Sequence, residues 1–192
     1  MNIVIFGPPG AGKGTQSNYI VKKFHLHQLS TGELLRNEIN NNTKLGQQIA
    51  STINSGNLVS DNIVSDLIEK YISNKIYEGR LIFDGYPRNL NQATNLDRLL
   101  KKYSQKIDIV LKLSVGLETI KKRILERKNL EKRVDDNELI AIKRFETYEH
   151  NINPVINFYK QTNLLRVVNG EASIPKISEE ISALIDSIKG WL

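Results

Sequence analysis

Near the start of the 192-residue chain stands the segment Gly7-Pro8-Pro9-Gly10-Ala11-Gly12-Lys13, which fits the pattern G-x-x-x-x-G-K. A short β-branched run, Asn2 to Phe6, precedes it, and a helix-like stretch, Lys13 to Phe24, follows it. Glycines let successive backbone N–H groups converge on phosphate oxygens, and the positive end of a helix and a lysine ammonium attract the same anion. Because motif, strand and helix agree, the segment predicts a phosphate-binding loop rather than an ordinary glycine turn.

The loop departs from its pattern at one place. Gly14 follows Lys13, with Thr15 next, so the hydroxyl that usually contacts a magnesium ion is missing from its standard position. The loop alone therefore does not predict a metal contact.

Apolar, strand-like runs recur along the chain and alternate with helical patterns, which favours a parallel sheet covered by helices on both faces. The fold class is therefore α/β. The expected strands are Asn2–Phe6, Leu26–Leu29, Arg80–Phe83, Lys106–Leu113 and Leu164–Val168. The expected helices are Lys13–Phe24, Asn89–Lys102, Leu117–Arg127 and Ile174–Leu192. The long helical region 31–74 exceeds one crossover helix and predicts a helical insert.

The composition excludes several classes of protein. Hydrophobic residues make up 40% of the chain and charged residues 25%, which is typical of one soluble globular domain. The chain has no cysteine, so disulfides, thiolate zinc sites and cysteine nucleophiles are excluded, and its three histidines are too scattered for a metal cluster. No apolar run approaches the ~18 residues of a membrane span, and no signal peptide precedes the first strand, so we expect an intracellular protein.

Six groups of residues occur in the order found in one enzyme family. They are Gly7–Gln16, Ser30–Arg36, Gly56–Val59, Asp84–Arg88 with Gln92, Arg133–Asp136, and Arg144. Any one group is weak evidence, but the ordered set is specific and spans nearly the whole chain. With this set the sequence resembles the nucleoside monophosphate kinases, and most closely the adenylate kinases of the short-lid type.

The resemblance implies a P-loop three-layer fold with a five-stranded parallel sheet in a single domain, 1–192. The core would comprise residues 1–29, 60–125 and 137–192, the helical AMP-binding insert residues 30–59, and the short lid residues 126–136. The implied reaction is the reversible transfer of the terminal phosphoryl group of MgATP to AMP, giving two ADP and maintaining adenine nucleotide balance. A cytoplasmic monomer is expected, without zinc, nucleic acid or membrane partners.

Carried over position by position, the resemblance also implies the site residues. The catalytic residues would be Lys13, Arg88, Arg123, Arg127, Arg133 and Arg144. ATP would be bound by Gly10, Ala11, Gly12, Lys13, Gly14, Thr15, Arg127 and the backbone carbonyl of Ala172. AMP would be bound by Thr31, Arg36, Asn57, Leu58, Val59, Gly85, Tyr86, Pro87, Arg88, Gln92, Arg133 and Arg144. Asp84 would hold Mg²⁺ through water.

The residue types suit these roles. An arginine guanidinium is a planar fork that can bind two phosphate oxygens at once. The Gln92 amide can donate and accept together, as the edge of adenine requires. Asp84 ends an apolar strand at the carboxyl edge of the predicted sheet, where open α/β folds bind their ligands.

Some of these segments also have plainer interpretations. Ser30 and Glu33 have the spacing of a capping box, and Asp84-Gly85 could form a simple turn. The lysines and arginines from Lys121 to Arg133 could form a solvated helix face. Asp135 and Asp136 could hold the lid through charge pairs, and Asp135 with Glu138 also resembles a helix start. Neither aspartate is given a catalytic role.

The chain also departs from the family pattern. Lys128 and Lys132 stand where short-lid members usually carry glycines, which is expected to stiffen the lid or change how it closes. Ser60 stands where a proline is common, and Ala172 where a glycine usually offers its carbonyl to adenine. A carbonyl contact can survive the last exchange.

Two rival functions stay open at this level. A kinase for UMP or CMP would share the phosphate machinery, but such relatives tend to carry alanine and asparagine at the positions of Thr31 and Gln92. A P-loop protein that binds nucleic acid or senses nucleotides would suit the net charge of +6. Such a sensor has no need for Arg36, Arg88 and Gln92 beside a complete donor loop, and no RNA-binding aromatic motif is present.

Overall fold

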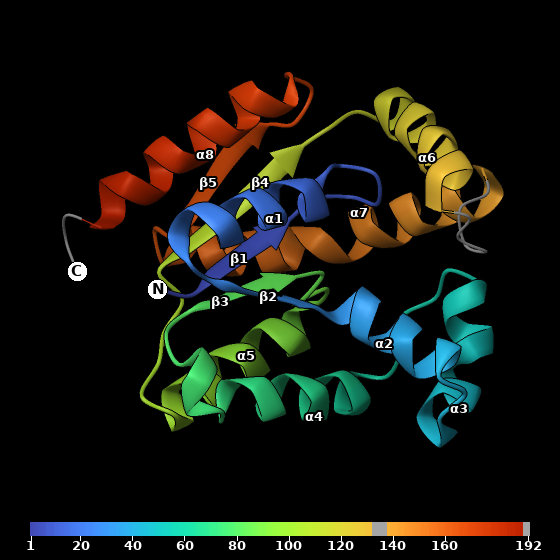
Figure 1. Ribbon diagram of the computed structural model, residues 1–192, viewed down its shortest axis with the longest axis horizontal. Helices are drawn as coiled ribbons and strands as arrows, with labels where there is room; N and C mark the ends of the chain where they lie inside the picture. The colour runs from blue at the N-terminus through green and yellow to red at the C-terminus, as the bar shows by residue number, and fades with distance from the viewer. Residues whose placement is uncertain (132–137, 190–192) are drawn as a thin grey trace.

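Five strands form one parallel sheet in the computed structural model, which describes residues 1–131 and 138–189 (Figure 1). The strands are β1 Ile3–Phe6, β2 His27–Ser30, β3 Leu81–Asp84, β4 Ile109–Ser114 and β5 Leu165–Asn169. Their order across the sheet is β2-β3-β1-β4-β5, and each neighbouring pair is parallel. The predicted α/β class and five-stranded sheet are confirmed, with strand ends displaced by at most three residues.

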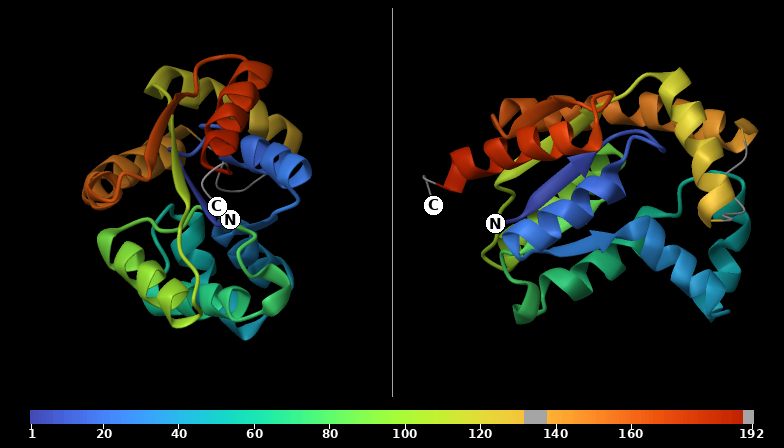
Figure 2. Two further views of the ribbon diagram at one scale, coloured as in Figure 1. Left: turned by 90° about the vertical axis from the view of Figure 1, so that its left-hand side faces the viewer. Right: turned by 45° about the horizontal axis from the view of Figure 1, so that its top comes forward.

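Helices cover both faces of this sheet. Helices α1 (Lys13–Phe24) and α8 (Ile174–Lys189) pack on one face, and α4 (Asp61–Ile72), α5 (Leu90–Lys102) and α7 (Glu138–Gln161) form the layer on the other. In the left view of Figure 2 the sheet is seen nearly on edge between α1 with α8 and α7. Helices α2 (Thr31–Asn40), α3 (Lys44–Asn54) and α6 (Leu117–Glu131) lie beyond the carboxyl ends of the strands (Figure 1). None of the helices within 1–131 and 138–189 is both long and apolar enough to cross a membrane.

Strand β1 explains why the first apolar run is unbroken. Its alternate side chains point to opposite faces, so Val4 and Phe6 join the core beneath α4, α5 and α7, whereas Ile3 and Ile5 join the core beneath α1 and α8. All four are almost completely buried. A strand in the middle of a parallel sheet needs apolar residues at every position, and each buried side chain contributes about 1.5–3 kcal/mol.

The chain changes direction across the sheet at β1. From β1 it passes through α1 to β2 on one side, and from β3 it later crosses to β4 on the other side, so β3 and β4 flank β1. Such a switch point opens a crevice at the carboxyl end of the central strand. Gly7, the first residue of the predicted loop, follows β1 at this crevice.

The predicted helical region 31–74 divides into three α-helices. A 3-10 turn, Lys75–Tyr77, follows them. Thr43 separates α2 from α3, because its hydroxyl oxygen caps α3 by accepting a hydrogen bond from the N–H of Gly46 at 2.9 Å. The two helices touch so closely that a Cβ on Gly46 would lie 2.1 Å from the carbonyl oxygen of Glu38. The insert is thus a folded unit rather than a long crossover.

Helix α6 runs further than the sequence predicted, to Glu131 rather than Arg127. Lysine, leucine and glutamate are good helix formers, and three of the four residues that follow Arg127 are of these types. The first six residues of the predicted lid, 126–131, are therefore helical. Lys132, Arg133, Asp135 and Asp136 lie outside the described residues.

Candidate active site

The loop after β1 is held in a shape that glycine favours. Gly10 and Gly12 have φ angles of +82° and +91°, in the left-handed region that residues with a Cβ rarely adopt. Gly12 is the N-cap of α1 and has no side-chain cap, so the first N–H groups of the helix face the space beyond the loop. This is the geometry of an anion site at a helix N-terminus.

Lys13 is the first residue of α1, and its side chain extends back to the loop. Its Nζ donates hydrogen bonds to the carbonyl oxygens of Gly7 at 2.8 Å and Pro8 at 3.0 Å. The ammonium is thereby kept beside the loop, and the residue lines both cavities described below.

The first cavity, called here the loop cavity, lies over the loop and the start of α1. Arg123 of α6 borders it and donates to the carbonyl oxygens of Gly170 at 2.9 Å and Ala11 at 3.4 Å, which ties α6 to the loop and to the β5–α8 connection. Ala172 also lines it. The predicted ATP-site residues that line the loop cavity are Gly10, Ala11, Gly12, Lys13, Gly14, Thr15 and Ala172. Arg127 lies four residues after Arg123 in α6, and its side chain is outside the described part of the structure.

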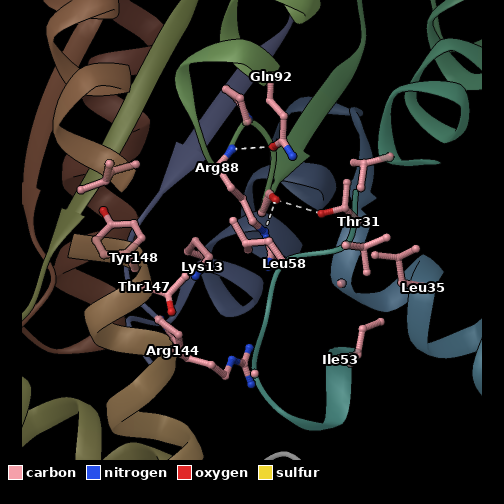
Figure 3. A pocket seen from close by; sticks show the side chains of 18 of the residues that line it. Lys13, Thr31, Leu35, Ile53, Leu58, Arg88, Gln92, Arg144, Thr147 and Tyr148 are labelled. Atoms are coloured by element: carbon pink, nitrogen blue, oxygen red, sulfur yellow. Dashed lines mark hydrogen bonds between the residues drawn. The ribbon is translucent and has the colours of Figure 1, made fainter. Parts of the chain in front are cut away.

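The second cavity, called the insert cavity, lies between α2, α3 and α4 on one side and α7 on the other. Figure 3 shows Thr31, Leu35 and Ile53 on one wall and Arg144, Thr147 and Tyr148 on the opposite wall, with Arg88 between them. The predicted AMP-site residues that line it are Thr31, Arg36, Asn57, Leu58, Val59, Gly85, Pro87, Arg88, Gln92 and Arg144. Its walls therefore combine apolar side chains with a few polar and cationic groups, as in small-molecule sites generally.

Tyr86 is the one described residue of the predicted AMP site that lines neither cavity. Its ring is fully buried in the core beside α5, and its hydroxyl oxygen accepts a hydrogen bond from Asn95 Nδ2 at 3.4 Å. Burial raises the pKa of its phenol. The peptide bond between Tyr86 and Pro87 is cis.

Positive charge converges at the boundary of the two cavities. Arg36 and Arg88 approach the same spot, since a Cβ on Gly32 would lie 3.3 Å from Nη1 of Arg36 and 3.6 Å from Nη2 of Arg88. Burial, and secondly the nearby Arg144, lower the pKa of Arg88 to about 10, while Asp84 opposes this shift and Arg36 adds to it. The guanidinium is still charged at neutral pH, and an anion placed among these cations would relieve their repulsion.

The polar side chains of the insert cavity are fixed by hydrogen bonds to the β3–α5 connection (Figure 3). The Thr31 hydroxyl donates to the carbonyl oxygen of Gly85 at 2.9 Å, and Arg88 Nε donates to the same oxygen at 2.7 Å. The backbone N–H of Arg88 donates to Oε1 of Gln92 at 2.7 Å. With its proton so engaged, the Thr31 oxygen faces a ligand as an acceptor.

Asp84 ends β3 and lines the loop cavity with 7% of its surface exposed. Gln28 of β2 donates from Nε2 to Oδ2 of Asp84 at 2.9 Å, which leaves the carboxylate turned toward the loop. A carboxylate at this edge is the kind of oxygen donor that Mg²⁺ prefers. The residues here fit a water-mediated magnesium site, and within 1–131 and 138–189 no group of three or more histidines, aspartates and glutamates gathers to bind a metal directly.

Several residues at the site were not predicted from the sequence. Gln28 supports Asp84, and Asp61 at the start of α4 accepts from Nε2 of Gln92 at 2.7 Å. Both had signals in the sequence, a polar residue within a short strand and an acidic residue at a helix start, but these signals also occur in ordinary surfaces. Thr147 and Tyr148 line the insert cavity because α7 passes it, which no local motif indicates.

A phosphate-binding loop at the switch point of a parallel sheet, joined by a cationic boundary to a second cavity, defines a P-loop phosphotransferase with two phosphate-bearing substrates. The family model of adenylate kinase matches residues 5–164 of the chain. The adenylate kinase of Pelagibacter ubique is 40% identical, covering 96% of this chain and 99% of the relative, and that of Maricaulis maris is 41% identical over 97% and 99%. The adenylate kinase of Porphyromonas gingivalis is 39% identical over 98% of this chain and 97% of the relative.

The chain belongs to the adenylate kinase family. Family and fold agree with the resemblance expected from the ordered motifs, and both are confirmed. The activity is that of the family, phosphoryl transfer between ATP and AMP to give ADP.

Proposed function

We propose that ATP binds in the loop cavity and AMP in the insert cavity, so that the terminal phosphoryl group of ATP passes across their common boundary and returns in the reverse reaction. One observation carries this proposal. Lys13, Arg36, Arg88 and Arg144 line both cavities, so four cations lie where a donor and an acceptor phosphate would meet. Phosphoryl transfer depends on alignment and on neutralising charge, and such a cluster supplies both.

The proposed reaction needs no nucleophilic side chain and no general base. An oxygen of the AMP phosphate attacks the terminal phosphorus of ATP, and the bond to the bridging oxygen of the leaving ADP breaks. The attacking oxygen is already anionic near neutral pH, so no proton has to be removed from it. The protein therefore acts by positioning the two phosphates and by offsetting the charge around the transferring group.

On the ATP side, the N–H groups from Gly10 to Thr15 would bind the phosphates and the ammonium of Lys13 would move from the loop carbonyls to them. Arg123 and Arg127 would add charge from α6, and the carbonyl of Ala172 would contact adenine. The loop offers the phosphates a cradle without needing a hydroxyl at position 14.

On the AMP side, Arg36, Arg88 and Arg144 would bind the phosphate, together with Arg133, which lies outside the described residues. The backbone of Asn57–Val59, Gly85 and Pro87 would contact the nucleoside, and Thr31 and Gln92 would bind the edge of adenine. The acceptor oxygen of Thr31 suits the amino group of adenine.

Asp84 is the proposed anchor for magnesium, through water, with Gln28 holding its carboxylate. Magnesium held there would supply positive charge that offsets the charge of the ATP phosphates. The chain's own contribution is to keep an acceptor oxygen at the edge of the loop cavity.

We further propose that core 1–29, 60–125 and 137–192 stays fixed while insert 30–59 and lid 126–136 close over the substrates. Lids of this kind, those of adenylate kinases among them, exclude water that would otherwise accept the phosphoryl group. Helix α6 enters the lid region without a break, and a variant with glycine at positions 128 and 132 is expected to change the rate of opening more than that of chemistry. The enzyme is proposed to act as a cytoplasmic monomer, which sedimentation of the purified protein and fractionation of cells would test.

The experiment that tests the function is a steady-state assay with MgATP and a panel of AMP, GMP, CMP and UMP, following both ADP formed and monophosphate consumed. Fast turnover with AMP alone is expected. Faster turnover with CMP or UMP would overturn the assignment of Thr31 and Gln92. Salt-dependent RNA binding without turnover of any monophosphate would favour the binding-protein alternative.

A further inference from the structure

Asp61, the first residue of α4, is joined to the segment that carries Arg88 and Gln92. Its Oδ1 accepts hydrogen bonds from Nε2 of Gln92 at 2.7 Å and from Nδ2 of Asn89 at 3.0 Å. Asn89 in turn accepts from the backbone N–H of Gln92 at 2.8 Å and caps α5. Asp61 itself does not line the insert cavity, whereas Gln92 does.

This arrangement fixes which way the amide of Gln92 points. A carboxylate can only accept a hydrogen bond, so the atom of Gln92 that meets Asp61 has to be the amide nitrogen. The backbone N–H of Arg88 can only donate, so the atom that meets it at 2.7 Å has to be the amide oxygen. Gln92 is 3% exposed, so both contacts act away from bulk water.

We propose that Asp61 is a positioning residue for base selection, which holds the amide of Gln92 in one orientation toward the bound monophosphate. This inference rests on the proposed placement of AMP in the insert cavity. The amide keeps one hydrogen and one lone pair for the ligand, and the Asp61 contact fixes their order. Adenine offers an acceptor nitrogen beside an amino donor, whereas hypoxanthine offers a donor beside an acceptor oxygen, so a fixed amide separates AMP from IMP.

Asp61 and the backbone N–H of Arg88 hold the amide of Gln92 in the same orientation, one at its nitrogen and the other at its oxygen. Without the carboxylate, Gln92 is held at its oxygen only, and the amide nitrogen has no charged partner to keep it toward α4. One hydrogen bond instead of two then opposes a turn of the side chain, so the reverse order of donor and acceptor is reached more readily. Loss of Asp61 is therefore expected to weaken AMP binding and to relax the choice of base, while the ATP side, built on the loop, is unaffected.

The test compares Asp61→Ala with Asp61→Asn. The alanine variant is expected to raise KM for AMP about tenfold and to lower the ratio of kcat/KM for AMP over IMP by about tenfold, the size of one well-placed hydrogen bond. KM for ATP should stay within about twofold. The asparagine variant keeps an acceptor oxygen for Gln92 and should recover most of the AMP/IMP ratio.

Asp66→Ala is the matched control, because Asp66 is an exposed acid on the same helix. Asp61 also places negative charge at the start of α4, so Asp61→Ala is expected to lower the melting temperature slightly. If Asp61 had only a structural role, Asp61→Ala would lower the melting temperature but leave the AMP/IMP ratio of kcat/KM unchanged. That outcome overturns the inference.

A double-mutant cycle separates a direct effect from one through Gln92. If Asp61 acts through the amide, Asp61→Ala changes the AMP/IMP ratio in the wild-type background but not in a Gln92→Ala background. Equal changes in both backgrounds would contradict this. A wild-type enzyme that does not consume AMP would overturn the proposed function instead, so the two failures are distinguishable.

Discussion

The loop cavity and the insert cavity both face phosphate, yet they are built from different parts of the chain. The loop cavity has backbone N–H groups at the start of α1, which two glycines with positive φ hold in place, in addition to the cations that it shares with the insert cavity. The insert cavity takes its charge from three arginines, Arg36, Arg88 and Arg144, on α2, the β3–α5 connection and α7. The loop cavity thus adds a fixed piece of backbone to the shared cations, whereas the charge of the insert cavity comes from side chains.

This difference implies different responses to change. Backbone donors cannot be removed by substitution, so the loop cavity is sensitive to the conformation of its glycines. Side-chain donors can be removed one at a time by substitution. Each removal takes away one cation that would bind a phosphate. The insert cavity should therefore lose function through single arginines and the loop cavity through backbone strain.

The largest expected effect comes from Arg88, which lies at the boundary of both cavities. Arg88→Ala should lower kcat/KM for AMP by about 10³-fold, because a positioned arginine is worth that much in phosphoryl transfer. Arg88→Lys should recover only part of the loss, since lysine is a point charge without the planar fork. Steady-state kinetics with AMP and ATP varied in turn measure both.

Arg98→Ala is the control for this pair, because Arg98 is an exposed arginine of α5 that donates a hydrogen bond to Oδ1 of Asn95 at 2.7 Å. It should leave the kinetics unchanged. If Arg88→Lys matched the wild type, charge alone would suffice and the fork geometry would be irrelevant.

A smaller effect is expected from strain in the loop. Gly12→Ala places a Cβ in open space but at a φ of +91°, so it should lower the free energy of unfolding by about 1–2 kcal/mol through conformation alone. Gly14→Ala also meets open space, but it lies in α1 without a positive φ, so stability should not fall. Urea denaturation of the two variants without nucleotide gives the comparison.

The Gly12→Ala and Gly14→Ala variants also test the difference between the two cavities when their KM values are measured. Gly12→Ala shifts the N–H groups at the start of α1 and should raise KM for ATP while KM for AMP stays close to the wild-type value. A rise in KM for AMP of equal size would mean that the loop shapes both cavities.

The contrast also explains what the sequence could predict. The phosphate-binding loop of the loop cavity is one continuous segment, Gly7–Gln16, so its motif, strand and helix could be recognised together. The insert cavity joins residues from distant segments, and only the family resemblance linked Arg36 with Arg144. Asp61 and Gln28 escaped prediction because each acts through another side chain, and a single acid or amide is not distinctive in a sequence.

The predicted end of helix α6 was wrong for a local physical reason. The sequence predicted that α6 would end at Arg127, but only Asn129 disfavours a helix between Lys128 and Glu131, and the helix continues. The expected capping role of Ser30 is confirmed, since its hydroxyl oxygen accepts from the N–H of Glu33 at 3.4 Å. Capping is a contact within a few residues and can be predicted from spacing, whereas no single local residue determines where α6 ends.

The smallest expected effect concerns Glu171, which fastens the β5–α8 connection to the start of α6 on the loop-cavity side. Its carboxylate accepts hydrogen bonds from the hydroxyl of Thr119 and the N–H of Gly116, each at 2.6 Å. These contacts, that from Thr119 first, lower the pKa of Glu171 from its ordinary value of 4.5. The ionised carboxylate therefore stabilises the fold above that value, and the contribution is lost as the pH falls through the lowered pKa.

Glu171→Gln should lower the melting temperature slightly at pH 7, and the gap to the wild type should close as the pH is brought from 6 toward 3. The reason is that a protonated glutamate offers no more than the neutral amide does. Glu180→Gln, at an exposed position on α8, should give no gap that depends on pH in this way. A Glu171→Gln gap that persists at pH 3 would mean that packing, rather than the charge at the start of α6, holds this side of the loop cavity together.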